Sequence, residues 1–169
     1  MQSNNGSWRG FNSVVLELEI FQKLFKKITW IGSDYSLTKI DNALLAVPID
    51  IPCIALPIIG GKSLRKKLTS IPNGMLYAYY MLKEIPKADI IHVRGPNAVM
   101  FITMLIAPFY KKKKWWFKYA NNWVDPKPPL FWGIQKKLMR YYTFSVGTVN
   151  GLWDGEPKHI KAFNNPIGS

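Results

Sequence analysis

The chain has 169 residues, of which 48% are hydrophobic, and this composition is typical of a folded domain rather than of a disordered chain. Lysine and arginine outnumber aspartate and glutamate by 23 to 10, which leaves a formal net charge of +13. This excess favours an anionic partner: nucleic acid, an anionic membrane surface or a phosphorylated ligand. Cys53 is the only cysteine, which excludes an intrachain disulfide and a cysteine-rich zinc site.

The first half of the chain predicts one helix followed by extended segments. Residues 12–27 place Val15, Leu18 and Phe21 on one helical face. Residues 28–32 predict a short strand. The prolines in residues 43–58 exclude a helix interior, so this segment is predicted to be extended and to lie at the edge of a sheet.

The second half alternates short apolar strands with helices. This pattern predicts an α/β fold, a Rossmann-like parallel sheet with helices on both faces. Its longest apolar run, Ala98 to Phe109, is too short to cross a bilayer, so a soluble or peripheral protein is expected. The predicted helices cover residues 71–85, about 96–110 and 130–142, and the predicted strands cover 88–93, 115–120, 143–149 and 159–163.

Polar residues follow four successive strands, in "HVRGPN", "KYANNW", "TVNG" and "AFNNP". In an open parallel sheet, ligands bind outside the carboxyl ends of the strands. Asparagine carries both a donor and an acceptor, which suits hydroxyl-rich ligands such as sugars. Asparagine, glycine and proline are also the commonest turn residues, so each single strand end has a backbone explanation as well.

His92 and Arg94 have the same parity on their strand and therefore point to one face. His92 could act as a general base or bind a hydroxyl, and a buried packing role is the equal alternative. Arg94 beside Gly95 and a helix start at Pro96 forms a corner suited to an anion. His159 is the only other histidine, so we expect no metal site.

Four segments together resemble a known family: "ADIIHVRGPN", "WWFKYANNW", "TVNGLWDGEPKHIKAFNNP" and the early "NGSWRGFNS". They resemble the N-terminal, acceptor-side domain of retaining glycosyltransferases of the GT-B class, family-four type. The resemblance implies a single Rossmann-like domain over residues 1–169, one half of a GT-B fold. In that family, the loop in the place of Gly6, Ser7, Arg9 and Gly10 faces the donor phosphates and the acceptor.

The sequence departs from this family at both ends. The family opens with an apolar strand, whereas this chain begins with the polar "MQSNNG", so the first strand is expected to be missing. The final "AFNNP" resembles the connection to a second domain, which in the family holds the nucleotide-sugar and a pair of glutamates. We therefore expect this C-terminal domain to be absent, residues 1–169 to be inactive alone, and no cofactor beyond the nucleotide-sugar substrate.

A basic aromatic segment, "YKKKKWWFK" at residues 110–118, is typical of the headgroup layer of an anionic membrane. The alternative to membrane contact is that the lysines form a solvated turn and the aromatic residues after them begin a buried strand. Residues 132–142 form a second basic, amphipathic stretch of the kind that lies on membranes. The predicted membrane contacts are Lys111, Lys112, Lys113 and Lys114.

The leading hypothesis is the acceptor-binding half of a glycosyltransferase that transfers a sugar from a nucleotide-sugar to a glycan or lipid-linked acceptor. The expected place is the cytoplasmic face of the membrane. The alternatives are a non-catalytic subunit that recruits a separate catalytic chain to the membrane and, behind it, a basic nucleic-acid-binding module. The predicted site consists of His92 as the catalytic residue and of Gly6, Arg9, Gly10, Arg94, Asn97, Asn121, Asn122 and Asn150 as acceptor- or donor-binding residues.

Overall fold

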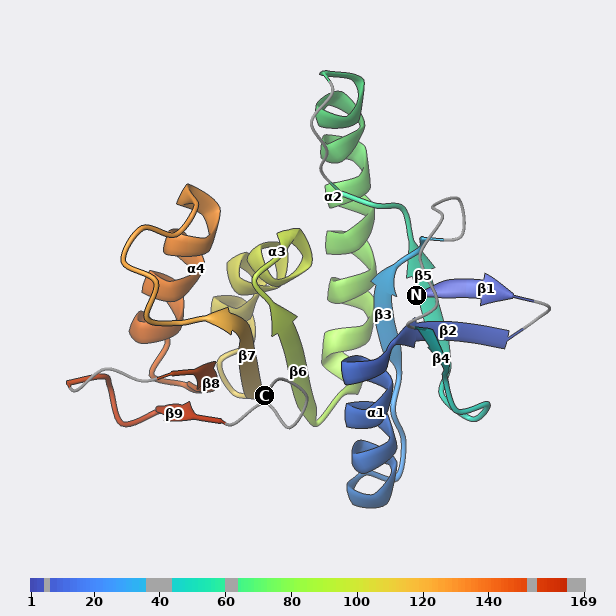
Figure 1. The fold of residues 1–169 in the computed structure, drawn as a ribbon, viewed down its shortest axis with the longest axis horizontal. Coiled ribbons are helices and arrows are strands. Elements are labelled where there is room, and N and C mark those ends of the chain that lie inside the picture. The colour runs from blue at the N-terminus through green and yellow to red at the C-terminus, as the bar shows by residue number, and fades with distance from the viewer. Residues whose placement is uncertain (5–6, 36–43, 60–63, 152–154, 164–169) are drawn as a thin grey trace. The chain divides into compact units, whose positions relative to one another are not determined.

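The computed structural model describes residues 1–4, 7–35, 44–59, 64–151 and 155–163 (Figure 1). The chain divides into two compact units, Met1–Asn73 and Gly74–Ser169, which we call the N-terminal unit and the C-terminal unit. The single domain expected over the whole chain stays a prediction.

The N-terminal unit contains helix α1 and two small sheets. α1 (Asn12–Leu24) confirms the predicted amphipathic helix and buries Val15, Leu18 and Phe21. The antiparallel sheet consists of β1 (Gln2–Asn4), β2 (Ser7–Phe11) and β4 (Leu44–Ala46), and the parallel pair consists of β3 (Trp30–Ser33) and β5 (Cys53–Leu56). β4 and β5 confirm that the proline-containing segment is extended.

Helix α2 (Leu64–Glu84) crosses from the first unit into the second and leads into the 3-10 helix η1 (Ile85–Lys87). The predicted start at residue 71 is wrong, because the helix begins at Leu64 and contains Pro72. Proline lacks the N–H that an interior helical residue donates, so it normally marks a boundary. Among the described residues, no helix has both the length and the apolar character needed to span a membrane.

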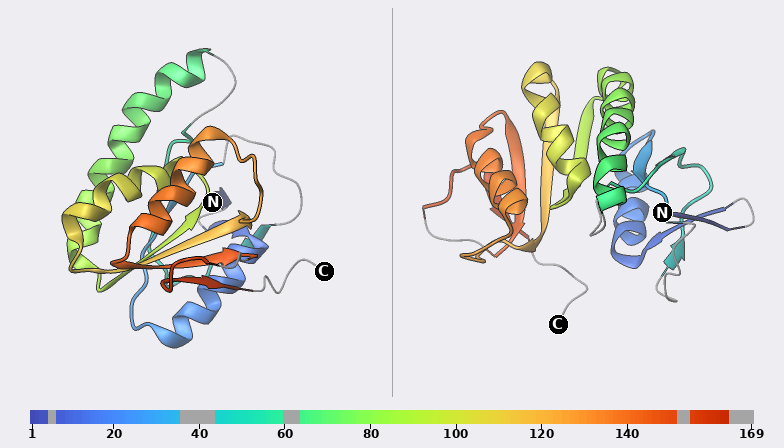
Figure 2. Two further views of the ribbon diagram at one scale, coloured as in Figure 1. Left: turned by 90° about the vertical axis from the view of Figure 1, so that its left-hand side faces the viewer. Right: turned by 90° about the horizontal axis from the view of Figure 1, so that it is seen from above.

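The C-terminal unit confirms the predicted parallel sheet. Its four strands pair in parallel in the order β6-β7-β8-β9 (Figure 2). The strands are β6 (Ile90–Gly95), β7 (Lys114–Asn122), β8 (Ser145–Asn150) and β9 (Ile160–Ala162), and the helices between them are α3 (Ala98–Ile106) with η2 (Ala107–Tyr110), and α4 (Leu130–Tyr141). Each lies within a few residues of its predicted range.

Helices α3 and α4 pack on the same face of this sheet (Figure 2). Gly95 lies directly against Met100 of α3, and Gly147 lies against Met139 of α4. The reason is the strand order, because right-handed connections that advance in one direction leave their helices on one side. The chain is thus a mixed α/β protein with parallel sheets. Helices on both faces, and one half of a GT-B fold, stay predictions.

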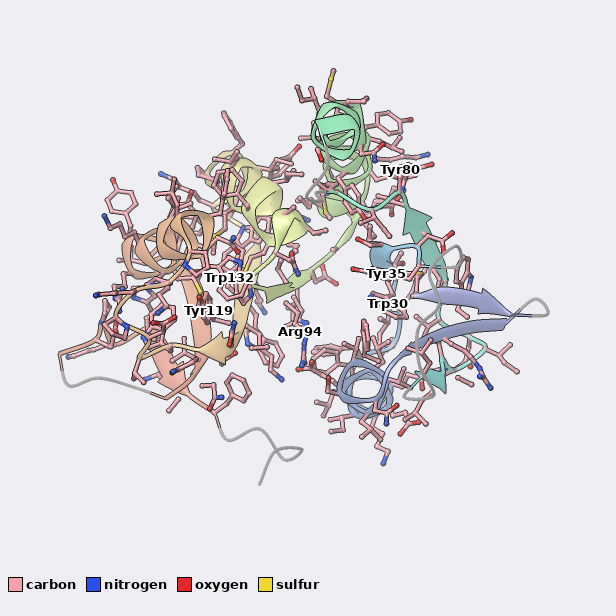
Figure 3. All side chains as sticks on the ribbon, turned by 45° about the horizontal axis from the view of Figure 1, so that its top comes forward. Trp30, Tyr35, Tyr80, Arg94, Tyr119 and Trp132 are labelled. Carbon is pink, nitrogen blue, oxygen red and sulfur yellow. The ribbon has the colours of Figure 1, made fainter. Side chains whose placement is uncertain are left out.

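The alternation of side chains sorts the residues of this sheet. Val93, Phe117 and Val149 are buried on the helix-covered face, together with Gly95 and Gly147. The opposite face carries mostly polar or mixed side chains from the same strands: His92, Arg94, Trp116, Lys118, Val146 and Thr148. In Figure 3, Arg94 points away from α3 and α4.

The tight contact at Gly95 gives the first prediction. A Cβ atom at residue 95 would lie 2.9 Å from Cβ and 3.0 Å from Cγ of Met100, close to the backbone of α3. We expect Gly95→Ala to lower the free energy of unfolding by about 1–3 kcal/mol, measured by urea denaturation. Gly147→Ala is the matched control, because its Cβ would meet only the flexible ends of Ile160 and Met139. A larger loss for Gly147→Ala would contradict this packing.

Candidate functional site

The carboxyl ends of β7 and β8 bring three of the predicted asparagines together. Asn122 lies opposite Asn150 in the register of the two strands, and the backbone N–H of Trp123 donates to the Asn150 carbonyl over 3.0 Å. Asn121 precedes Asn122, and all three residues are exposed. We call Asn121, Asn122 and Asn150 the asparagine rim. The structure therefore places these predicted site residues at one edge of one sheet.

Two side chains of the asparagine rim also shape their own turn. The Oδ1 atom of Asn121 accepts from the backbone N–H of Asn122 over 2.8 Å, and Oδ1 of Asn122 accepts from the N–H of Val124 over 3.1 Å. The turn explanation therefore holds at these positions. The ligand-binding explanation stays a prediction. Within the described part of the chain these bonds use only the amide oxygens, so the NH2 groups remain as donors toward a ligand.

Asn97 has a structural role that differs from its neighbours on the edge. Its Oδ1 accepts from the Met100 N–H over 2.8 Å, which caps the start of α3. Its Nδ2 donates to the Arg94 carbonyl over 2.8 Å, and its backbone N–H lies 3.3 Å from Oε1 of the buried Gln135. The Asn97 amide thus fixes the corner between β6 and α3.

His92 lies deeper than the asparagine rim. Its strand partner Trp116 lies opposite Val146 of β8, which stands four residues before Asn150, about 13 Å along the strand at 3.3 Å per residue. Its ring packs edge-to-face on Trp116 with ring centroids 4.4 Å apart, and its Nε2 atom is buried. Trp116 Nε1 in turn donates to Thr148 Oγ1 over 2.8 Å. His92, Trp116 and Thr148 therefore contact one another in turn across three strands on the face that bears Arg94, with Thr148 diagonal to Trp116.

The remaining predicted phosphate-binding residues belong to the N-terminal unit. Arg9 is exposed on β2, and Gly10 beside it is buried. A Cβ atom at Gly10 would lie 2.7 Å from Trp30, so this glycine allows a close approach of β2 to the Trp30 ring. Gly6 lies outside the described residues. Their expected role at the donor phosphates stays a prediction.

The lysines predicted to contact a membrane lie at the opposite end of β7 from the asparagine rim. Lys114 begins β7 and Asn122 ends it, a separation of about 25 Å along an extended strand. Lys111 and Lys112 are exposed in the turn before the strand. Lys113 instead donates to the carbonyls of Pro86 and Ala88, each over 2.8 Å, and so anchors this turn to η1.

A partly buried polar cluster behind the asparagine rim is absent from the sequence-based predictions. Arg140 of α4 binds Glu156 through Nε at 2.9 Å and through Nη2, and the Trp123 indole N–H donates to the same carboxylate over 2.8 Å. The Arg140 guanidinium lies 4.6 Å from the centroid of the Trp123 ring. The cluster joins α4 to the loops that follow β7 and β8. We call Trp123, Arg140 and Glu156 the loop anchor.

Lys136 adds a second inward-pointing cation. It is 4% exposed, its Nζ donates to the Asp125 carbonyl over 3.0 Å, and it lies near the faces of Tyr119 and Trp123. The sequence of residues 132–142 predicts a basic stretch that lies on a membrane, whereas Lys136 and Arg140 point toward the sheet-edge loops. Lys136 and Arg140 are four residues apart, as are the buried Gln135 and Met139 beside them. This spacing was the sequence signal that the two cations lie on the inward side of the helix.

The electrostatics of this cluster follow from its burial. Burial lowers the pKa of Lys136, with Asp125 acting in the opposite direction. Burial, with a smaller contribution from Asp125, raises the pKa of Tyr119 to about 12, so its hydroxyl stays protonated at neutral pH. Burial alone would raise the pKa of Glu156, but hydrogen bonds from Arg140 and Trp123 outweigh it and hold the pKa below 4.5. Among the described residues there is no cluster of three potential metal ligands.

Comparison with protein-family models, with curated proteins and with solved structures finds no match to this chain. The case for the site therefore depends on the geometry of the C-terminal unit alone.

The loop anchor gives the second prediction. The folded-state pKa of Glu156 lies below its unfolded value, so its contribution to stability is present above about pH 4.5 and is lost as the pH falls through the folded pKa. We expect Glu156→Gln to lower the free energy of unfolding at pH 7 by about 1.5–3 kcal/mol, measured by urea denaturation. The difference between the two proteins should shrink toward pH 3. A difference that does not change with pH would exclude an ionised Glu156 as the anchor.

Proposed function

We propose that this chain is the acceptor-binding half of a glycosyltransferase, which holds a glycan or lipid-linked acceptor while a sugar is transferred from a nucleotide-sugar. The observation that supports this most is the asparagine rim at the carboxyl edge of the parallel sheet. Its exposed amides offer directional, uncharged hydrogen bonds, which match sugar hydroxyls better than they match a charged ligand.

The proposal gives each part of the face a task. Asn121, Asn122 and Asn150 bind acceptor hydroxyls, Arg94 attracts the anionic part of the acceptor or donor, and His92 contacts the reacting hydroxyl below the rim. In a retaining transferase, catalysis depends on positioning and on stabilising the leaving phosphate. In this proposal Gly6, Arg9 and Gly10 serve that phosphate, and the nucleotide-sugar is held mainly by a C-terminal domain or a separate catalytic chain.

The second partner in this proposal is an anionic membrane at the cytoplasmic face. The excess of basic residues supports it, together with the exposure of Lys111 and Lys112. A lipid-linked acceptor would then be bound where it is anchored, by a protein that associates with the membrane surface without spanning it.

The third prediction tests the asparagine rim with octyl glycosides of glucose, galactose, mannose and N-acetylglucosamine as probes. We expect at least one of them to shift the NMR signals of the Asn122 and Asn150 side-chain amides. Asn122→Ala should weaken this binding about three- to tenfold, the range for one lost hydrogen bond. Asn12→Ala is the control, because Asn12 is an equally exposed asparagine at the start of α1. Shifts absent from the rim for every probe would contradict the proposal.

The fourth prediction concerns His92 in a transferase assembled from this chain and the domain or subunit that holds the nucleotide-sugar. We expect His92→Ala to reduce transfer about 100-fold or more, as loss of a group that handles a reacting proton does. His159→Ala should retain transfer, because His159 Nε2 lies 2.9 Å from the Met139 carbonyl and serves packing. Unchanged turnover in His92→Ala, with circular dichroism like that of the parent, would assign His92 to packing against Trp116.

A further inference from the structure

In the C-terminal unit, the helices α2, α3 and α4 and the 3-10 helix η2 expose several large apolar side chains. Phe109 is 82% exposed, Tyr141 is 80% exposed and Leu130 is 76% exposed. Large exposed apolar surfaces on a protein rich in charge mark sites of interaction. We call this set of side chains the helical outer face, and it consists of Met75, Tyr79, Leu82, Leu105, Phe109, Leu130, Phe131 and Tyr141.

The exposed residues follow helical spacing. On α3 and η2, Leu105 and Phe109 are four residues apart and continue the row begun by Phe101. On α2, Met75 and Tyr79 are likewise four residues apart. Residues at this spacing lie one above the other on the same side of a helix, so each helix presents a stripe that points away from the sheet.

The stripes lie side by side because the helices are neighbours. Gly74 of α2 faces the side chain of Ile102 of α3, and the rings of Phe101 and Phe131 meet edge-to-face with centroids 5.5 Å apart. The hydroxyl of Tyr142, directly after α4, donates to the Met104 carbonyl of α3 over 2.8 Å. Figure 2 shows α2, α3 and α4 arranged in this way on one side of the β6–β9 sheet.

The charge on the helical outer face is positive. Lys83 lies in the last turn of α2, Lys111 and Lys112 follow Phe109 in the chain, and Lys137 lies between Leu130 and Tyr141 on α4. All four are exposed. Glu84 is the acidic residue at the end of α2, and Lys87 pairs with it over 2.7 Å. Apolar and aromatic side chains fringed by lysines complement the acyl and headgroup layers of an anionic bilayer.

We propose that the helical outer face docks this protein on an anionic membrane, with α2, α3 and α4 lying along the bilayer surface. A second copy of the chain is a poorer occupant, because two molecules of net charge +13 repel each other. This inference deepens the membrane partner of the proposed function and relies on that function only for the acceptor.

The docking geometry places the start of α4, and the sheet edge that carries the asparagine rim, at one end of the membrane-facing helix layer. Leu130 and Phe131 form the first residues of α4, which starts at the carboxyl edge of the sheet where Asn122 ends β7. Membrane contact through Lys111 and Lys112 alone would not bring the rim near the lipid. About 25 Å of strand separates the turn that carries these lysines from the rim. An acceptor on a lipid anchor would then reach the rim by extending past the start of α4, because α3 and α4 lie between the sheet and the bilayer.

The test is co-sedimentation with vesicles of phosphatidylcholine alone and of phosphatidylcholine with an equal amount of phosphatidylglycerol. We expect the full chain to bind the anionic vesicles and the triple variant Leu105→Ser, Phe109→Ser, Phe131→Ser to bind them at least about tenfold more weakly. The matched control is Ile20→Ser, Leu24→Ser, Ile49→Ser, which removes three equally exposed apolar side chains from the N-terminal unit and should bind as the parent does.

A second variant tests the lysines separately from the apolar contacts. Lys111→Glu with Lys112→Glu should weaken binding to the anionic vesicles and leave the weak binding to neutral vesicles unchanged. Equal binding by the parent and the apolar triple variant would overturn the inference. The inference would also be overturned if light scattering shows a dimer for the parent and a monomer for the triple variant, since a second copy would then cover the helical outer face.

The vesicle experiment and the octyl glycoside titration fail independently. Rim shifts with no vesicle binding would overturn the docking surface and leave the proposed function standing. Vesicle binding that depends on Phe109 and Phe131, with no rim shifts for any glycoside, would support the docking surface and contradict the acceptor site.

Discussion

The parallel hydrogen-bonded register of β6, β7 and β8 is the constraint on which the candidate site depends. It brings the carboxyl ends of the strands to one edge, so Asn122 and Asn150, 28 positions apart in sequence, become neighbours. The same register aligns His92 with Trp116 on the next strand. Because side chains alternate along each strand, one choice of register decides both which residues pack under the helices and which face outward.

The edge is held in place by groups that do not contact a ligand in our proposal. Arg140 and Trp123 bind the Glu156 carboxylate, and Lys136 holds the Asp125 carbonyl, so α4 fixes the loops after β7 and β8. Asn97 fixes the loop after β6 in the same manner. A site formed by loops needs such support, because hydrogen bonds to a sugar are lost when the donors shift by about 1 Å.

Most elements of the fold could be predicted from the sequence, because helical and strand periodicity is a local property. Helix α1 could be predicted from the spacing of Val15, Leu18 and Phe21. The parallel sheet could be predicted from the alternation of strands and helices after residue 85. The start of α2 was missed, since Pro72 lies inside a helix where local rules disfavour it. Helices on both faces were expected from the alternation of strands and helices and stay a prediction, while the order β6-β7-β8-β9 places α3 and α4 on one face of this sheet.

The site was harder to predict than the fold, because the sequence gives residue types and not their partners. The strand-end pattern found Asn121, Asn122 and Asn150, but it could not distinguish them from Asn97, whose amide caps α3. The basic, amphipathic pattern of residues 132–142 likewise assigned Lys136 and Arg140 to a membrane-facing stretch. Their partners, the Asp125 carbonyl and the Glu156 carboxylate, come from loops 11 and 16 residues away, and only the folded chain shows the pairing.

The separation between the loop anchor and the asparagine rim has a consequence for how this protein could diversify. Glu156, Arg140 and Trp123 hold the backbone from behind, while Asn121 and Asn150 project outward from it. In the proposed acceptor site, a substitution at Asn150 would therefore alter ligand preference while the anchor still holds the loop, whereas one at Asn121 would also remove the hydrogen bond to the Asn122 N–H. New specificities would be reachable in one mutational step each, as long as the buried carboxylate and its partners are inherited unchanged.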